Sequence, residues 1–174
     1  MSIKRPPYIV STRDVPEIAG KYYPNSPEVF GHGRAIGQFA GLLRIGLHIE
    51  RLSPGERSSM PHAEQDQEEF VYVLEGTVNA WIQGELFAMV AGDLAAFPAG
   101  TGIAHVMIND SDADALLLVG GERNKSDNKI VYPLNPERRN DLPWSLWWAD
   151  APVHALGPHD GTASPREGNT PASE

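Results

Sequence analysis

The stretch that decides the fold is residues 55–76, which read GERSSMPHAEQDQEEFVYVLEG. From Glu69 to Leu74 it is rich in Val, Tyr, Phe and Leu, so it predicts a strand with side chains on two alternating faces. Both faces are apolar, which indicates a strand buried on both sides, and Glu69 is the exception at its start. His62 and Glu64 are two residues apart, so on a strand they share a face. An antiparallel hairpin can return Glu69 beside that pair.

A second informative stretch is residues 92–109, which read GDLAAFPAGTGIAHVMIN. It contains His105 and, four positions later on the same predicted strand face, Asn109. The chain has no cysteine, so a metal ion would have to be held by imidazole and carboxylate groups. Two imidazoles and one or two carboxylates that converge inside a barrel would suit a divalent first-row metal.

Short runs with strand character fill the middle of the chain. The fifteen prolines and seventeen glycines interrupt the chain at short intervals and leave few windows for a helix. Many short strands at regular spacing predict an all-β fold, a barrel or sandwich of antiparallel strands. The predicted strands lie at 41–52, 58–63, 69–75, 77–83, 85–90, 93–97, 104–109 and 113–120.

Together the two stretches resemble the paired motifs of the cupin family. The first motif of that family is matched by Gly55, His62, Glu64, Glu69 and Gly76, and the second by Gly92, Pro98, Gly100, His105 and Asn109. The resemblance covers about residues 55–109. It implies a jelly-roll β-barrel, also called a double-stranded β-helix, which is commonly dimeric and holds one metal ion near its mouth.

Three positions depart from the family pattern. Gly55 is one residue too far from His62, and four residues instead of two separate Gly100 from His105. Both spacing changes fall in predicted loops. Glu64 stands where the family has the second histidine of a shell of three histidines and one glutamate. Carried over by position, the implied ligands are His62, Glu64, Glu69 and His105, and such a set suits Zn(II), Fe(II) or Mn(II) better than copper.

Each implied ligand also has a purely structural interpretation. His62 could be a solvated histidine that follows a proline, and His105 could be a core histidine bonded to a backbone carbonyl. Glu64 lies in an acidic run, and such runs are usually solvated loops. Glu69 could be an edge acid at a strand start, although the alternation after it turns it inward. Asn109 is more often a turn residue at a strand end than a functional one.

The flanks of the predicted barrel, residues 41–120, differ in composition. Residues 1–40 are rich in proline and predict an N-terminal arm that packs on the barrel, with one strand around 8–10. Residues 121–160 form a C-terminal extension with three tryptophans within five positions, and residues 161–174 predict a disordered tail. So much apolar surface predicts a homodimer interface, unless the tryptophans fold back over their own barrel. The residues concerned are Trp144, Trp147 and Trp148 with Leu134, Leu142 and Leu146.

Charge and hydropathy narrow the range of partners. The formal net charge of −9 would repel phosphate backbones, so nucleic acid is not an expected partner. No apolar run approaches the roughly 20 residues that span a bilayer, and the N-terminal residues lack the apolar stretch of a signal peptide. We therefore expect a cytoplasmic protein without a membrane partner.

Three functions fit this pattern. The first is a metal-dependent enzyme that acts on a small molecule, by resemblance an oxygenase, isomerase or lyase, with His48 and Glu50 as candidates for an additional acid or base. The alternative is a non-catalytic barrel that binds or senses a small ligand around a structural metal. The third is a structural barrel that has lost its metal site. Fold alone does not separate them, because one scaffold hosts many chemistries.

Overall fold

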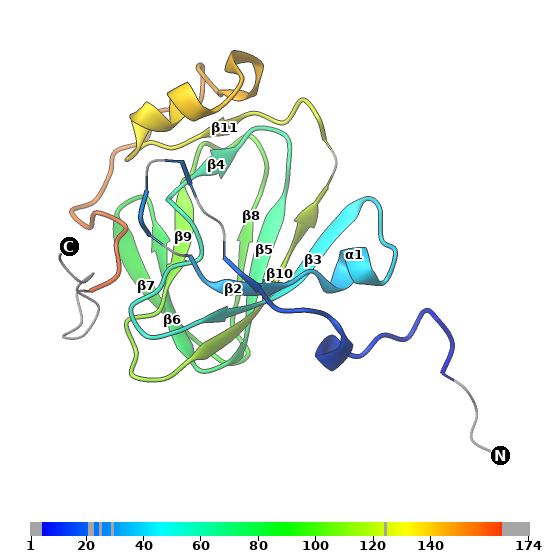
Figure 1. The fold of residues 1–174 in the computed structure, drawn as a ribbon. Helices are drawn as coiled ribbons and strands as arrows, with labels where there is room; N and C mark the ends of the chain where they lie inside the picture. Colours follow the sequence, from blue (N-terminus) through cyan, green and yellow to red (C-terminus); the bar gives the residue numbers. More distant parts are fainter. Residues whose placement is uncertain (1–4, 21–22, 25, 29, 124, 165–174) are drawn as a thin grey trace.

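The computed structural model describes residues 5–20, 23–24, 26–28, 30–123 and 125–164. Two antiparallel sheets face each other and form a barrel, as Figure 1 shows. The larger sheet has the order β1 (Ile18–Ala19), β2 (His32–Arg34), β3 (Ile45–Leu52), β10 (Ala115–Glu122), β5 (Glu69–Glu75) and β8 (Leu94–Phe97). The smaller one has the order β7 (Glu85–Val90), β6 (Thr77–Ile82) and β9 (His105–Ile108), and β4 (Ala63–Glu64) pairs with β11 (Ile130–Val131). The all-β antiparallel fold is confirmed.

The described helices are short. One α-helix, α1, spans Ile36–Phe39, and single 3₁₀ segments span Thr12–Asp14, Pro136–Asp141 and Trp144–Leu146. No helix in the described part of the chain combines the length and the apolar character needed to cross a bilayer.

Alternation along the strands places the core between the two sheets. Leu52, Val73 and Leu117 are fully buried, and they belong to one cluster with residues of the facing sheet such as Val78 and Met107. These apolar side chains recur at every second position, as expected for strands with one face on the core. Burying a side chain of this size stabilises the fold by about 1.5–3 kcal/mol. The core therefore positions the strand ends that carry the site.

One predicted strand is wrong over most of its length, the one at 58–63. The segment makes only isolated bridges there, from Arg57 to Ile108 and from His62 to His105. Pro61 has no N–H group to donate to a ladder, which is the physical reason for the interruption. The other predicted barrel strands have their counterparts in β3 and β5 to β10.

Turn glycines of the two sequence motifs have conformations that other residues rarely adopt. Gly76 joins β5 to β6 with φ at +78°, and a Cβ atom there would lie 2.8 Å from the carbonyl oxygen of Asp114. Glycine avoids both penalties because it has no side chain. The turn lies against Asp114 and Ala115 at the start of β10, and β5 pairs with β10 so that Glu69 is opposite Gly121.

The N-terminal arm joins the larger sheet, but not where the sequence predicted. Residues 8–10 form no strand, and Tyr8 is 87% exposed. The strands are instead β1 and β2, with β2 paired along the edge of β3. The guanidinium of Arg34 donates to the carbonyl oxygens of Thr12 and Val15 and holds the preceding segment against the sheet. Long-range pairing of this kind leaves no periodic signal in so short a strand.

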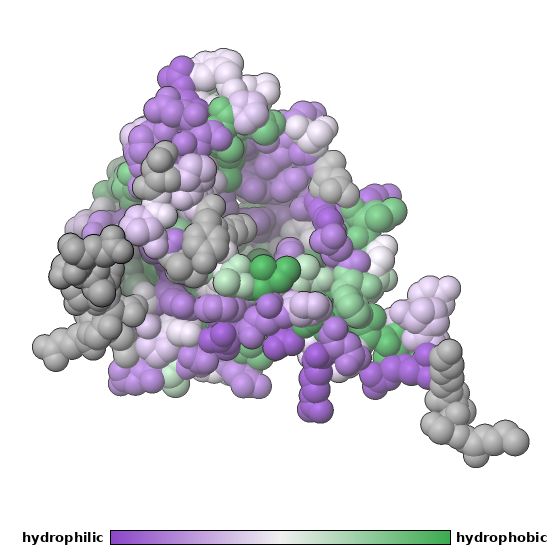
Figure 2. Space-filling view, viewed as in Figure 1, coloured by the Kyte–Doolittle hydropathy of each residue, from purple (hydrophilic) through white to green (hydrophobic). Residues whose placement is uncertain are grey.

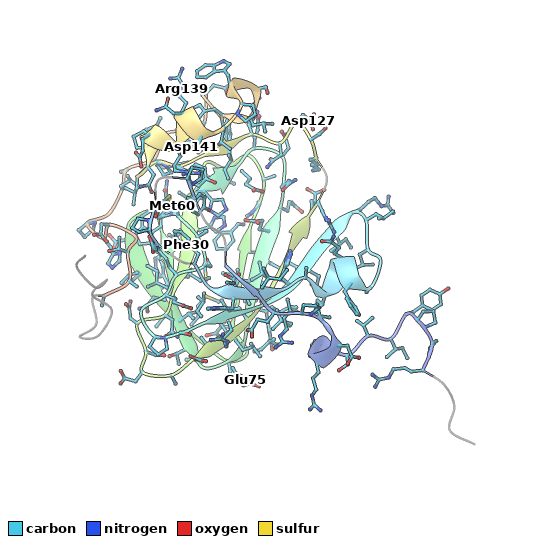
Figure 3. All side chains as sticks on the ribbon, in the orientation of Figure 1. Phe30, Met60, Glu75, Asp127, Arg139 and Asp141 are labelled. Atoms are coloured by element: carbon cyan, nitrogen blue, oxygen red, sulfur yellow. The ribbon has the colours of Figure 1, made fainter. Side chains whose placement is uncertain are left out.

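The tryptophans of the C-terminal extension mostly pack on their own chain. Trp148 is buried in a cluster with Trp81, and Trp147 packs against a cluster that contains Phe30 and Met60. Figure 3 shows Phe30 and Met60 below the C-terminal segment that carries Arg139 and Asp141. Trp144 is exposed, with the Arg139 guanidinium 3.7 Å from its ring centroid. This packing is the alternative to a tryptophan-built interface, and dimerisation itself stays a prediction.

Residues 161–164 contact the barrel, whereas residues 165–174 lie outside the described residues. The carbonyl oxygen of Gly161 accepts a hydrogen bond of 2.6 Å from the buried guanidinium of Arg57. The other nitrogens of that guanidinium bind both carboxylate oxygens of Glu28 at 2.6 Å. The amide of Ser164 donates to Asp110 at 2.8 Å. Arg57 thus joins the N-terminal arm and the beginning of the predicted tail.

Candidate metal centre

Three of the four predicted ligands converge inside the barrel. Glu69 begins β5, His105 begins β9, and His62 lies just before β4. The carboxylate Oε2 of Glu69 lies 3.3 Å from Nε2 of His105 and 3.6 Å from Nε2 of His62. Backbone hydrogen bonds in both directions hold the two histidines opposite each other. The barrel strands thereby hold His62, Glu69 and His105 next to one another, although they are far apart in sequence.

The spacing of these three atoms fits a single metal ion. One nitrogen or oxygen atom from each residue lies within 4.8 Å of the others. Two donor atoms that each lie about 2.1 Å from one ion at a tetrahedral angle are about 3.4 Å apart. The separations of 3.3 Å and 3.6 Å match this value closely. These two separations are compatible with one divalent ion shared by the three side chains.

Hydrogen bonds on the far side of each imidazole orient the rings for this role. Nδ1 of His62 lies 2.9 Å from the carbonyl oxygen of Met60, and Nδ1 of His105 lies 3.4 Å from that of Ile103. A carbonyl oxygen only accepts, so each Nδ1 carries a proton, and each Nε2 presents a lone pair when its ring is neutral and an N–H group when its ring is protonated. Two lone pairs and a carboxylate that face one another require a proton or a metal ion between them. Metal-bound histidines in proteins are oriented by the same kind of contact.

Electrostatics favour the metal-binding forms of two of the three groups, Glu69 and His105. Burial raises the pKa of Glu69, but hydrogen bonds from His105 and His62 and their charges outweigh it and hold that pKa well below its usual range. Burial lowers the pKa of His105 below 6.5 despite the opposing effect of Glu69. Glu69 is therefore charged and His105 neutral near pH 7, which are the ligating forms of both side chains.

Two aromatic rings that sequence reasoning missed pack against the histidines. The ring of Phe97 stacks on His105 with centroids 3.5 Å apart and an angle of 2° between the planes. The ring of Tyr132 lies 5.8 Å from that of His62. Phe97 is also the cross-strand partner of Glu69, so alternation in β8 could have placed it near the site. No sequence signal places Tyr132 there, because β11 reaches the site only through tertiary packing.

Glu64, the fourth predicted ligand, is not in the group of metal-capable side chains that the described residues form around Glu69. It lies on β4, opposite Ile130 of β11. Burial is the main cause of the raised pKa of Tyr132, Tyr23 adds to it, and the charge of Glu64 makes a smaller contribution in the same direction. Ligation by Glu64 stays a prediction.

The three candidate ligands face a small cavity that adjoins a larger one. The inner cavity has a volume of about 50 Å³ and is bordered by the three ligands together with Glu50, Ser58 and Ser59. The outer cavity has a volume of about 370 Å³ and is bordered by His48, Glu50, Ser58 and Glu69. Figure 2 shows this face of the molecule hollowed above β2. His48 and Glu50, predicted as acid or base candidates, thus lie beside the ligand set.

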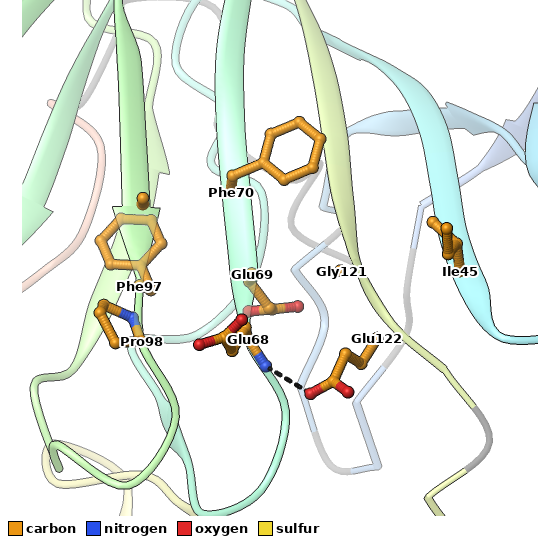
Figure 4. A pocket seen from close by; sticks show the side chains of 9 residues that line it. Ile45, Glu68, Glu69, Phe70, Phe97, Pro98, Gly121 and Glu122 are labelled. Atoms are coloured by element: carbon orange, nitrogen blue, oxygen red, sulfur yellow. Dashed lines mark hydrogen bonds between the residues drawn. The ribbon is translucent and has the colours of Figure 1, made fainter.

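A further cavity, of about 320 Å³, lies at the end of the larger sheet. Figure 4 shows the carboxylates of Glu68, Glu69 and Glu122 gathered there, and the amide of Glu68 donates to Glu122 at 3.3 Å. A hydrogen bond of 2.6 Å from Lys125 to Glu122 lowers the pKa of Glu122 from its usual value. Glu69 therefore borders three cavities.

Comparisons with known proteins agree with this geometry. Residues 48–120 match the family model described as the cupin domain. A sugar phosphate isomerase of a cupin superfamily from Silicibacter pomeroyi is similar over 71% of this chain and 80% of its own, with 33% identity and a TM-score of 0.66. The chain belongs to the cupin superfamily. No curated protein sequence matches this cupin.

Two other solved structures are similar to this cupin. A putative sugar phosphate isomerase from Acidithiobacillus ferrooxidans has 25% identity and a TM-score of 0.67, over 73% of this chain and 81% of its own. The polyketide cyclase RemF from Streptomyces resistomycificus has 23% identity and a TM-score of 0.57, over 84% of this chain and 99% of its own. The likeness to RemF shows the fold alone.

The cupin motif residues of this chain divide into candidate ligands and turn formers. Asn109 is fully buried, and its side-chain amide donates to the carbonyl oxygens of Leu52 and Ala113. Its side-chain oxygen accepts from the amide and hydroxyl of Ser111. Asn109 therefore closes the turn between β9 and β10, as its structural interpretation predicted.

Proposed function

We propose that this cupin binds one divalent metal ion through His62, Glu69 and His105 and acts on a small hydroxycarbonyl compound as a metal-dependent isomerase. The observation that carries the proposal is the convergence of two imidazole Nε2 atoms and a carboxylate beside a cavity. Similarity to a sugar phosphate isomerase at 33% identity supports isomerase chemistry over oxygenase or lyase chemistry. Glu64 stays a predicted fourth ligand.

The donor set supports a particular group of metals. Imidazole nitrogen and carboxylate oxygen suit Zn(II), Fe(II) or Mn(II), and three protein ligands leave coordination positions for a substrate. When bound there, a divalent ion would act as a Lewis acid on a carbonyl or hydroxyl oxygen.

Isomerisation also needs a group that moves a proton between neighbouring carbon atoms, and we assign this role to Glu50. It borders both the inner and the outer cavity, and it lies on the interior face of β3 with His48. The Glu50 carboxylate would take a proton from the carbon beside the carbonyl, and the electron pair of that C–H bond would pass to the carbonyl oxygen. The protonated Glu50 would exchange its proton with solvent and then protonate the former carbonyl carbon, while the hydroxyl proton of the neighbouring carbon passes to the former carbonyl oxygen, which completes the shift.

The test combines metal analysis with isotope exchange. Protein purified without a chelator or a histidine tag should contain stoichiometric metal. In D₂O it should introduce deuterium beside the carbonyl group of at least one member of a panel of aldoses and ketoses, free and phosphorylated. His62→Ala should lose both metal and exchange, whereas Glu50→Gln should keep the metal and lose the exchange. Absence of stoichiometric metal, or of metal-dependent exchange with the whole panel, would overturn the proposal and favour a binding role.

A further inference from the structure

The outer cavity is enclosed by the N-terminal segment rather than by the barrel alone. Its outer wall consists of Ile18, Ala19, Gly20, Gly31, Gly33 and Ala35. Glu50, Ser58, Glu69 and Val119 border this cavity and also the inner cavity with the metal ligands. A ligand bound at the metal can therefore extend into a space that strands β1 and β2 close.

The lining of the outer cavity suits hydroxyl groups. Glu50 offers a carboxylate that accepts hydrogen bonds, and His48 and Ser58 add ring nitrogens and a hydroxyl oxygen. The negative charges of Glu50 and Glu69 oppose an anionic group in the same space. A volume of about 370 Å³ holds roughly a dozen water-sized groups, which is the size of a pentose or hexose.

Gly33 leaves a gap in the wall of this cavity. It lies directly opposite Glu50 on β3 and opposite Ile18 on β1. Directly paired residues of antiparallel strands turn their side chains to the same face, so a side chain at Gly33 would stand beside Glu50 on the cavity side. A Cβ atom at Gly33 would meet no atom within 4 Å. At Gly31, by contrast, it would lie 2.6 Å from Leu52 and 2.8 Å from the Glu50 carboxylate.

We infer that the uncharged, hydroxylated end of the substrate occupies the outer cavity and that Gly33 sets how long that end can be. The inference rests on the proposed function and concerns the part of the substrate that extends beyond the inner cavity. A larger side chain at Gly33 shortens the cavity without touching the ligands, because the gap there is open space.

The experiment measures binding of neutral aldoses to the metal-loaded protein by calorimetry. The probes are D-glyceraldehyde, D-erythrose, D-ribose and D-glucose, which lengthen by one hydroxylated carbon at each step. In the parent, affinity should rise with length, by about threefold to tenfold for each hydroxyl group that gains a hydrogen bond. Gly33→Leu should abolish this rise for the longer sugars and leave D-glyceraldehyde binding unchanged. Ala91→Leu is the control, because Ala91 lies in the exposed turn between β7 and β8; this variant should bind the four sugars as the parent does.

A second variant keeps the inference testable if Gly33→Leu does not fold. Glu50→Gln keeps the size of the side chain but removes its charge, so D-ribose should bind about tenfold more weakly, since charged hydrogen bonds are stronger than neutral ones. With Mn(II) in the site, enhanced relaxation of the sugar protons should show that the sugar lies next to the metal.

Unchanged length dependence in Gly33→Leu, or no binding of any of the four sugars to the parent, would overturn the inference. Metal content and deuterium exchange are measured separately, so the two failures can be told apart. Metal-dependent exchange without any effect of Gly33 would defeat only this inference, whereas absence of metal would defeat the proposed function.

Discussion

Replacing Glu69 by glutamine tests the metal centre most directly. The Glu69→Gln change keeps the length and shape of the side chain and removes the negative charge that lies 3.3 Å and 3.6 Å from the two imidazole nitrogens. Ligation by carboxamide oxygen is much weaker than ligation by carboxylate, so the site would retain only two strong ligands.

The expected loss of metal affinity follows from the position of Glu69 among the three donor side chains. Removing a group that only supports a metal ligand typically lowers affinity by about 10–100-fold. Glu69 is itself a predicted ligand and the one charged group in the three-residue set, so its loss should cost at least about 100-fold. That factor corresponds to about 2.8 kcal/mol of binding free energy.

Glu64→Gln is the matched comparison, because it makes the same chemical change two residues from His62. Glu64 lies outside the group of three, so metal binding by its variant as tight as in the parent would leave His62, Glu69 and His105 as the whole ligand set. A tenfold loss would instead make Glu64 the fourth ligand that the cupin motif implies. Glu64→His should then restore binding, since it rebuilds the three-histidine set.

The assay is a calorimetric titration of chelator-stripped protein with Zn(II) and with Mn(II) near pH 7. Circular dichroism of each variant checks that the barrel is folded. His62→Ala and His105→Ala should abolish binding and serve as the lower reference. If Glu69→Gln bound either metal as tightly as the parent, the assignment of the centre to His62, Glu69 and His105 would be refuted.

Three further predictions concern stability and assembly. Ending the chain before Gly161 removes the carbonyl oxygen that accepts a hydrogen bond from buried Arg57. Compared with a chain that ends at Ser164, the free energy of unfolding in urea should fall by about 1.5–3 kcal/mol. Equal free energies of unfolding for the two chains would contradict this role. The pKa values of His105 and Glu69 are lowered on folding from 6.5 and 4.5, so the unfolded metal-free chain binds more protons in acid. The unfolding free energy of the metal-free protein should therefore be highest above pH 6.5 and fall as the pH drops through 6.5 and then 4.5. An unfolding free energy that stays constant down to pH 4.5 would disprove this. Edge strands β7 and β8 expose apolar side chains that a second copy of the chain could cover, so we expect a homodimer in sedimentation. A 19.0 kDa monomer would contradict this expectation.

The sequence by itself determined most of the barrel and pointed to the three side chains that converge in it, which are three of the four proposed ligands. Strands such as β5 and β10 bury apolar side chains at every second position, and this periodicity is visible without any structure. The match of His62, Glu69 and His105 to the paired cupin motifs, together with strand alternation, was enough to predict that they converge. Local patterns succeed here because each ligand stands at or beside the start of a strand whose direction the alternation defines.

Only the tertiary structure decided the rest, because it depends on contacts between segments distant in the chain. Pairing of β2 with β3 closes the outer cavity, and packing of β11 brings Tyr132 to His62. The burial of Trp148 and the stacking of Phe97 on His105 also follow from such contacts. Their free energy comes from surfaces buried jointly by two segments, and neither segment carries a sign of its partner.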